Sequence, residues 1–441
     1  MIHHYSFQNL LKNLTRRQVL QASLGAGVSF LLPTLEARAT EKRGKERPKS
    51  LIVLWMAGGP SQFESWDPHP SSAVGETVNK IKTSVPGLEI SELLPQMAEQ
   101  MQNVSLIRSM VSKEGDHERG TYYAQTGYRP DPSVVHPSVT ALISKHLAND
   151  QVEIPQHISL ASGDGFVVPR GGFLGAEHDA FRVFDPGRNV RNMKASVEDT
   201  RQSRRLEGLN VVSKSFQQRR PIQSAETLHQ SVIDKALMMM SSEQLKAFSL
   251  DDESKETVEK YGDSRFGRGC LVARRLVEQG VRAVQVVLPG FDTHVNNLEL
   301  QSNLFRTLDP AYATLIADLK QRDLFDSTIV LCMGEFGRTP RVNPLQGRDH
   351  WPVGYSCVLG GGGLQTGHVI GATDPQAAPE QNQNVIETTP PESPITIPDL
   401  YATILKTMGL NPHEEIQSPI GRPFQLSEGT AIEQLLPEYL L

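Results

Sequence analysis

The fold of this chain is decided by one stretch of sequence, Cys332-Met333-Gly334-Glu335-Phe336-Gly337-Arg338-Thr339-Pro340. The apolar run at 329–333 leads directly into a glycine-flanked acid. Gly347-Arg348-Asp349-His350-Trp351 follows soon after it, and Gly290-Phe291-Asp292-Thr293-His294 stands upstream, behind another apolar run. An open α/β sheet presents its ligands in this way, at the carboxyl ends of buried strands. The pattern therefore predicts a metal-type or hydrolytic site.

Composition places the chain among ordinary globular proteins. It has 441 residues, of which 38% are hydrophobic and 21% charged, which is enough for one large domain or two smaller ones. The formal net charge is −6, and basic residues cluster only in the short segment 42–49, so nucleic-acid binding is not expected. Cys270, Cys332 and Cys357 lack C-x-x-C spacing and are too few for a disulfide framework, so we expect buried, unpaired thiols.

The amino terminus resembles an export signal. Arg16-Arg17 precedes a modest apolar run at 22–35 and then Ala37-Arg38-Ala39, a small-residue cleavage site. The paired arginines resemble a twin-arginine signal, and the run is too short to span a bilayer as a mature helix. An amphipathic N-terminal helix is the alternative. We therefore expect a signal peptide at 1–39, a linker at 40–49, and a periplasmic or extracellular protein whose mature chain has no transmembrane span.

Apolar runs alternate with helical periodicity along the rest of the chain. Strands are expected at 50–56, 103–110, 281–288, 327–333 and 355–359, and helices at 122–126, 138–147, 266–279, 303–322 and 397–408. The segment 158–188, rich in Gly and Pro, is expected to be an ordered surface loop. The charged segment 189–261 has apolar residues at helical spacing, which predicts a helical insertion. The alternation predicts an α/β fold with a mostly parallel sheet in a domain spanning 50–441.

Acids and histidines at the predicted strand ends are candidate metal ligands: Asp292, His294, Glu335, Asp349 and His350. Asp and neutral His suit Zn²⁺ or Mn²⁺, whereas carboxylates suit Mg²⁺ and Ca²⁺. In an extended D-x-H triplet, Asp292 and His294 would face the same way. A capped turn with a solvated histidine is the alternative.

The later two clusters have structural alternatives as well. Glu335 follows a buried strand, where an acid is costly unless it is paired, so a salt bridge to Arg338 or Arg341 is one interpretation. Asp349 either binds a metal or orients the imidazole of His350. A hydrogen bond that fixes the loop is the remaining possibility for this pair.

Two further segments follow predicted strands. In Asp116-His117-Glu118-Arg119-Gly120-Thr121, a helix N-terminus would favour an anion, and Arg119 is suited to clamp phosphate or sulfate. An N-cap with a surface salt bridge is the alternative. Gly58-Gly59-Pro60-Ser61 lacks the lysine of a phosphate-binding P-loop and instead indicates a turn that needs positive φ.

Several motifs together resemble one known family. They are Trp55-Met-Ala-Gly-Gly-Pro-Ser-Gln62 with Trp66-Asp67-Pro68, His117-x-x-Gly-Thr-Tyr-Tyr-x-x-Thr-Gly-Tyr128, Asp292-Thr-His294-x-Asn-Asn, Met-Gly-Glu335-Phe-Gly-Arg-Thr-Pro and Gly-Arg-Asp349-His350-Trp-Pro. Over about residues 50–426 the chain resembles the family catalogued as domain of unknown function 1501. Such proteins resemble the alkaline phosphatase/sulfatase superfamily, which implies a three-layer sandwich with metal ligands at strand ends.

The resemblance implies roles for individual residues. Asp292 and His294 stand where the superfamily has an Asp…His metal pair, and His350 stands at its late metal-binding histidine. Glu335 falls where an Asp-His pair closes a second metal site. The nucleophile position falls on His117, with Thr121 nearby but out of register.

One superfamily feature is missing from the first strand. The acid expected directly after that strand is absent, so Ser61 or Asp67 would substitute for it from a loop.

These observations predict an exported, metal-dependent hydrolase of phosphate or sulfate esters. His117, Thr121 and Arg119 would be catalytic, a divalent ion (Zn, Ca, Mg or Mn) would be the cofactor, and a small-molecule or glycan ester would be the substrate. The missing acid and the unassigned nucleophile leave an alternative open. That alternative is a catalytically inactive member of the same fold that binds a sulfated or anionic glycan or a cell-surface partner.

Overall fold

The computed structural model describes residues 49–70, 78–161, 163, 167–188, 190, 193, 196–219, 229–373 and 391–441. The signal peptide expected at 1–39 and nearly all of the linker expected at 40–49 lie outside these ranges, so both stay predictions. Within the described ranges, every helix is too short or too polar to cross a lipid bilayer.

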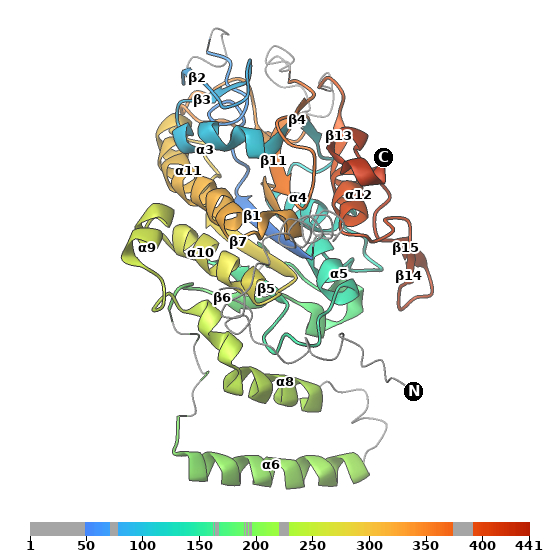
Figure 1. The fold of residues 1–441 in the computed structure, drawn as a ribbon. Coiled ribbons are helices and arrows are strands. Elements are labelled where there is room, and N and C mark those ends of the chain that lie inside the picture. The colour runs from blue at the N-terminus through green and yellow to red at the C-terminus, as the bar shows by residue number, and fades with distance from the viewer. Residues whose placement is uncertain are drawn as a thin grey trace, which may run out of the picture. The chain divides into compact units, whose positions relative to one another are not determined.

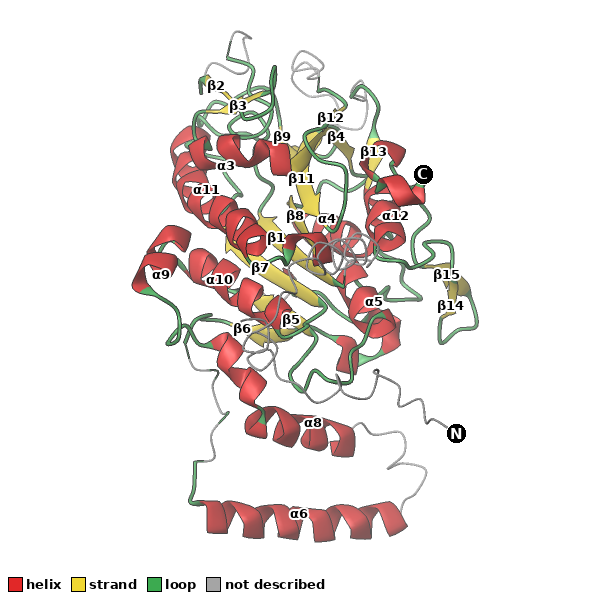
Figure 2. Ribbon diagram, in the orientation of Figure 1, coloured by secondary structure: helices red, strands yellow, loops and turns green. Residues whose placement is uncertain are grey.

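A mixed sheet forms the centre of the described structure (Figures 1 and 2). Its strands lie in the order β12 (Val369–Ile370), β4 (Val104–Val111), β11 (Tyr355–Gly361), β8 (Thr328–Met333), β1 (Ser50–Ala57), β7 (Ala283–Pro289), β5 (His157–Leu160) and β6 (Phe181–Val183), and β13 (Ile395–Thr396) also pairs with β4. β11 runs antiparallel to both of its neighbours, and the other pairings in this sheet are parallel. The predicted mostly parallel sheet is confirmed.

Helices cover both faces of the sheet. One core contains α3 (Pro95–Gln100), α10 (Arg265–Glu278) and α11 (Asn297–Gln321), and the other contains α4 (His117–Thr126), α5 (Val139–His146) and α12 (Ile397–Thr407). β1 supplies both cores, because successive side chains of a strand point to opposite faces. Its residues Ile52 and Leu54 lie in the first core and Leu51 and Val53 in the second. The continuous apolar run at 50–56 is therefore a strand between two helical layers, the predicted three-layer arrangement.

Smaller elements complete the described part. Three two-stranded hairpins pair β2 (Lys80–Lys82) with β3 (Glu89–Ser91), β9 (Gly337–Arg338) with β10 (His350–Trp351), and β14 (Glu415–Gln417) with β15 (Pro423–Gln425). The segment expected to be a helical insertion contains α6 (Asp199–Arg219), α8 (His229–Ser241) and α9 (Lys255–Tyr261). The three cysteines are buried and free, as expected.

The expectation of a surface loop at 158–188 is wrong in part. This segment includes nearly all of β5 and the whole of β6, and every residue of β5 is buried. β5 pairs in parallel with β7 and β6. Both strands are too short to show a period, and the Gly and Pro residues between them dominate the local composition.

Candidate metal centre

Segments that follow three strands of the sheet meet one hairpin at the carboxyl edge of the sheet. Asp292 follows β7, Glu335 follows β8, and His117 begins α4 after β4. His350 reaches the same place from the β9–β10 hairpin, in which it pairs with Arg338. Because β1, β7 and β8 are parallel neighbours, their ends lie at one edge, as the sequence pattern predicts.

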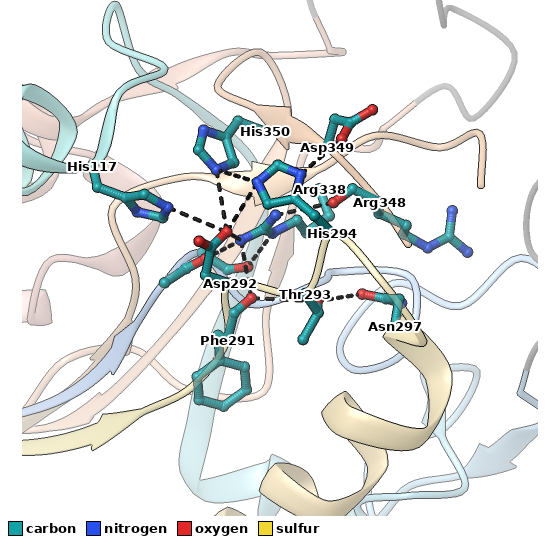
Figure 3. A network of polar contacts seen from close by, with 12 residues as sticks. His117, Phe291, Asp292, Thr293, His294, Asn297, Arg338, Arg348, Asp349 and His350 are labelled. Atoms are coloured by element: carbon teal, nitrogen blue, oxygen red, sulfur yellow. Dashed lines mark hydrogen bonds and ion pairs between the residues drawn. The ribbon is translucent and has the colours of Figure 1, made fainter. Parts of the chain in front are cut away.

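Asp292 is the hub of the cluster (Figure 3). Its Oδ1 lies 3.2 Å from His117 Nε2, 3.1 Å from His294 Nε2 and 3.3 Å from His350 Nε2. The Nε2 atoms of His294 and His350 are themselves 3.0 Å apart. On another side, Nη2 of the fully buried Arg338 donates to the same carboxylate oxygen at 2.7 Å. Three imidazole nitrogens therefore surround Asp292 Oδ1, and the ligand atoms of His117, Asp292 and His350 all lie within 4.8 Å of one another.

The second nitrogen of each imidazole contacts an oxygen that can only accept. His117 Nδ1 lies 2.9 Å from Glu335 Oε1, and His294 Nδ1 lies 2.8 Å from Asp349 Oδ1. His350 Nδ1 lies 2.7 Å from the carbonyl oxygen of Gly115. Each Nδ1 must therefore carry the proton, and in a neutral imidazole the lone pair is then on Nε2.

This arrangement leaves bare lone pairs that face one another. Two Nε2 atoms at 3.0 Å, with a carboxylate oxygen beside them, have no proton to share when the rings are neutral. His117 Nε2 is buried and forms no hydrogen bond within the described structure, although it is 3.2 Å from Asp292. A cation among these atoms would resolve the repulsion. Metal-bound histidines are held in this way, with the outer N–H donated to a carboxylate or carbonyl, and three nitrogens with one oxygen suit Zn²⁺.

Charge at the cluster also fits a divalent cation. Asp292, Glu335 and Asp349 contribute three formal negative charges, and Arg338 contributes one positive charge. The remaining formal charge of −2 is the charge that a divalent ion would neutralise. Carboxylates this close together are costly without such a partner.

Protonation of the cluster follows from its contacts. Burial opposes ionisation of Asp292, but the hydrogen bond and charge of Arg338 outweigh it and lower the pKa of this carboxyl. Burial, together with the charge of Arg338, lowers the pKa of His350 and favours the neutral ring that a metal requires. The hydrogen bond that His117 donates to Glu335 raises the pKa of His117, so metal binding at this ring competes with protonation.

Glu335 and Asp349 lie behind histidines. Glu335 is buried, and its Oε1 accepts from Gly58 N at 2.9 Å as well as from His117. The alternative of a salt bridge from Glu335 to Arg338 is not what the structure has, because Arg338 pairs with Asp292. Both acids therefore orient imidazoles in this structure, which is one of the two roles expected for Asp349.

The other predicted residues have different surroundings. Thr121 is buried, and its hydroxyl forms no hydrogen bond with any described residue. Arg119 donates to both carboxylate oxygens of Glu114, and the side chain of Asp116 caps α4, which is the structural alternative expected for this segment. The backbone N–H of Ser61 donates to Gln301 Oε1.

Asp67, the second proposed substitute for the missing acid, is held elsewhere. Its carboxylate pairs with Arg108 Nε at 3.1 Å and accepts from Thr373, and His69 Nε2 lies 3.4 Å away. These contacts lower the pKa of Asp67 against the opposing effect of burial. The structure thus assigns this acid a loop-fixing ion pair, and the cluster does not include it.

The turn after β1 explains why no acid follows the first strand. Gly58 has φ of +113°, and a Cβ at this position would lie 2.4 Å from the backbone nitrogen of Asp292. Gly59 has φ of +77°, and a Cβ there would lie 2.7 Å from the ring of Phe336. The predicted positive-φ turn is confirmed: a side chain at Gly58 would displace the Asp292 loop, and one at Gly59 would collide with the Phe336 ring.

Two components of the site were missed by sequence reasoning. Arg338 was considered only as a partner for Glu335, yet it donates to Asp292 and to the carbonyl oxygens of Gly58, Gly59, Phe291 and Arg348. The second is the backbone carbonyl of Gly115, which contacts His350 and which no residue type in the sequence could indicate. For Arg338, the signal was a basic residue three positions after Glu335 in the motif that follows the buried strand.

Comparison with known proteins places the chain in a family. A sequence model of the family described as "Protein of unknown function (DUF1501)" matches residues 48–436, and the chain belongs to this family. No protein of curated function matches it.

The chain is also similar to solved structures. The lipoteichoic acid synthase LtaP from Listeria monocytogenes is 10% identical, with 89% of this chain and 77% of that one covered and a TM-score of 0.40. The PsFucS1 sulfatase from Pseudoalteromonas sp. is 11% identical, with coverage of 85% and 70% and a TM-score of 0.38. A protein in the alkaline phosphatase superfamily from Vibrio parahaemolyticus is 12% identical, with coverage of 83% and 67% and a TM-score of 0.36.

Proposed function

We propose that this protein is an exported, metal-dependent hydrolase of phosphate or sulfate esters. The observation that supports the proposal most is the convergence of three histidine Nε2 atoms on Asp292 Oδ1, with every Nδ1 held by an acceptor. A divalent ion bound there would polarise an ester oxygen and lower the pKa of a water molecule.

Asp292, His117, His294 and His350 would hold the ion. The nitrogen-rich set favours Zn²⁺ or Mn²⁺ over Ca²⁺, which takes six to eight oxygen ligands. Glu335, Asp349 and the Gly115 carbonyl would keep the three rings in the required orientation. Within the described residues, the ligand atoms of His117, Asp292 and His350 form one group that lies within 4.8 Å of one another, and His294 adjoins it, so we expect about one ion per chain.

Water is the nucleophile that the cluster supports best. The Thr121 hydroxyl is buried and forms no hydrogen bond to His117 or Asp292 within the described residues. The side chains that contact Asp292 Oδ1 are the three histidines and Arg338, and these include no hydroxyl or thiol. A covalent intermediate on this chain is therefore not part of the proposal.

Two arginines beside the centre would receive the anionic group of the ester. Glu114 is buried, and it accepts from Arg119 Nε and Nη2 and from Arg129 Nε. Both arginine side chains are about half exposed, at 50% and 58%. Glu114 adjoins Gly115, whose carbonyl holds His350. A planar fork fixed by a carboxylate is suited to bind phosphate or sulfate bidentately.

Turnover of aryl phosphate and aryl sulfate by the purified full chain tests the proposal. We expect hydrolysis of at least one ester, loss of activity with a chelator, recovery on adding Zn²⁺ or Mn²⁺, and loss in His350→Ala. His413→Ala is the matched control, because His413 is exposed and contacts Gln425 instead. Failure to hydrolyse either ester with Zn²⁺, Mn²⁺, Mg²⁺ or Ca²⁺ present would contradict the proposal, and binding of a sulfated glycan without turnover would favour the inactive alternative.

Export is proposed from the paired arginines near the amino terminus. A double variant with Arg16→Lys and Arg17→Lys is expected to stay in the cytoplasm. Cell fractionation would measure this, with Lys12→Arg as the control. An exported double variant would show that another signal is used.

A further inference from the structure

We infer that a buried polar network built on the Glu64–Arg348 ion pair positions the metal ligands. The inference rests on the proposed function and deepens it, because it assigns a role to Glu64, Asn297, Thr293 and Arg348, which lie outside the proposed ligand set. These are positioning residues, because the hydrogen bonds described below join their side chains to one another and to the backbone beside the ligands.

The ion pair is fully buried. Both side chains have 0% exposure, and Nε and Nη2 of Arg348 donate to Glu64 Oε1 at 3.1 and 2.8 Å. The guanidinium of Arg348 also lies 5.1 Å from the centre of the Phe63 ring. Burying two charges is costly unless every lone pair and proton has a partner. A buried ion pair of this kind therefore holds the residues that donate to it or accept from it in fixed positions.

On one side the network holds the loop of Asp292 and His294. Glu64 Oε2 accepts from Asn297 Nδ2 at 2.9 Å, and Asn297 Oδ1 accepts from Thr293 Oγ1 at 2.6 Å. Figure 3 shows Asp292 and His294 directed toward the cluster and Thr293 directed the other way, toward Asn297. The network therefore fixes Thr293, the residue between the proposed ligands Asp292 and His294.

On the other side it holds the loop of Asp349 and His350. Arg348 Nη1 donates to the carbonyl oxygens of Thr339, at 3.0 Å, and of Pro340. The backbone N–H of Arg348 donates to the carbonyl oxygen of Thr293 at 3.1 Å. One residue, Arg348, therefore ties both ligand-bearing loops together immediately before Asp349, through its side chain and its backbone N–H.

The ligands depend on this support because they are poorly packed themselves. The side chains of Asp292 and His294 are 47% and 43% exposed, whereas Glu64 and Arg348 are 0% exposed. Exposed side chains on loops are free to reorient unless their backbone is fixed. Outer partners of metal ligands typically change metal affinity by about 10–100-fold when they are mutated.

The test measures Co²⁺ and Zn²⁺ affinity of the full chain, and the visible absorption of bound Co²⁺. Glu64→Gln removes the charge at nearly constant volume, and Thr293→Val removes the hydroxyl. We expect each variant to weaken metal binding by about 10–100-fold and to shift the Co²⁺ spectrum. If Glu64→Gln does not fold, Thr293→Val carries the test alone.

Matched controls separate positioning from general destabilisation. Glu253→Gln breaks another buried ion pair, with Arg274, and Thr407→Val removes another buried hydroxyl, which donates to Thr403 O. Both are expected to keep wild-type metal affinity and spectrum. The inference is overturned if Glu64→Gln and Thr293→Val also keep them. In that outcome wild type still binds Co²⁺, which distinguishes it from failure of the proposed function, in which wild type binds none.

Discussion

Two clusters of charged side chains in this molecule have different balances. The first joins α10 and α11 to a neighbouring turn, and its ion pairs link four carboxylates with three guanidinium groups: Asp252, Glu253, Glu278 and Asp318 with Arg274, Arg275 and Arg322. The second, at the carboxyl edge of the sheet, has three carboxylates and one guanidinium group: Asp292, Glu335 and Asp349 with Arg338.

The difference shows which cluster needs something from outside. In the helix cluster every carboxylate pairs with at least one guanidinium group, and four carboxylates against three guanidinium groups leave a formal charge of only −1. The sheet-edge cluster has a formal charge of −2 and three imidazole nitrogens whose lone pairs converge. The other N–H groups of Arg338 donate to carbonyl oxygens, and its single positive charge does not balance the three carboxylates. This difference in charge balance supports the proposed cation site at the sheet edge.

The largest expected effect breaks the sheet-edge cluster at its hub. In Asp292→Asn the carboxylate oxygen shared by three histidines becomes an amide. Metal affinity and ester turnover should fall by at least about 1,000-fold, beyond the 10–100-fold typical of outer partners. Metal titration and steady-state kinetics would measure both, with the exposed Asp326→Asn as control. A variant that retains wild-type affinity would show that Asp292 is not a ligand.

Breaking the helix cluster should affect stability instead. Glu253→Gln leaves Arg274, which is 1% exposed, without one of its buried partners. Removing one member of a buried ion pair costs about 3–5 kcal/mol of unfolding free energy. Urea unfolding would measure the loss, and metal affinity should stay unchanged. Loss of metal binding by the folded variant would mean that the two clusters are coupled.

A histidine outside the cluster sharpens the comparison. His157 is buried with both nitrogens satisfied, since Nδ1 donates to His178 O and Nε2 accepts from Thr140 Oγ1. Burial lowers the pKa of His157 from 6.5 to about 4. The unfolded chain then binds more protons than the folded one between these values, so stability is complete above pH 6.5 and is lost as pH falls to about 4.

The size of this acid effect follows from the shift in pKa. At 1.36 kcal/mol per unit, it is about 3 kcal/mol. Urea unfolding at successive pH values would measure it, and His157→Gln should flatten the dependence between pH 6.5 and 4. An unchanged pH dependence in the variant would show that other groups are responsible.

Metal addition should give the smallest of these effects. An ion that binds only the folded chain stabilises it by about 2.7 kcal/mol at 100 times its dissociation constant. Wild type should therefore gain stability on adding Zn²⁺, and His350→Ala should gain none. An equal gain in both would locate the stabilising ion elsewhere.

Much of this arrangement was predictable because its signals are local. The apolar runs at 50–56, 281–288 and 327–333 predict β1, β7 and β8, and the acids and histidines that follow predict where polar groups gather. The two strands β5 and β6 were missed because four and three residues show no period.

The partners within the site were not predictable, for a different reason. Glu64 and Arg348 are 284 positions apart, and no local pattern indicates that they meet. Likewise, the hydrogen bond from His350 to the Gly115 carbonyl depends on the path of the backbone rather than on a side chain. The position of Asp67 in the sequence made it a candidate for the site. In the structure it instead forms an ion pair with Arg108.

Elemental analysis of the purified full chain tests the central claim most directly. After exposure to Zn²⁺ and Mn²⁺ and removal of free metal, the account predicts about one divalent ion per wild-type chain and none in Asp292→Asn. A wild-type chain without metal, or equal metal in the two proteins, would contradict it.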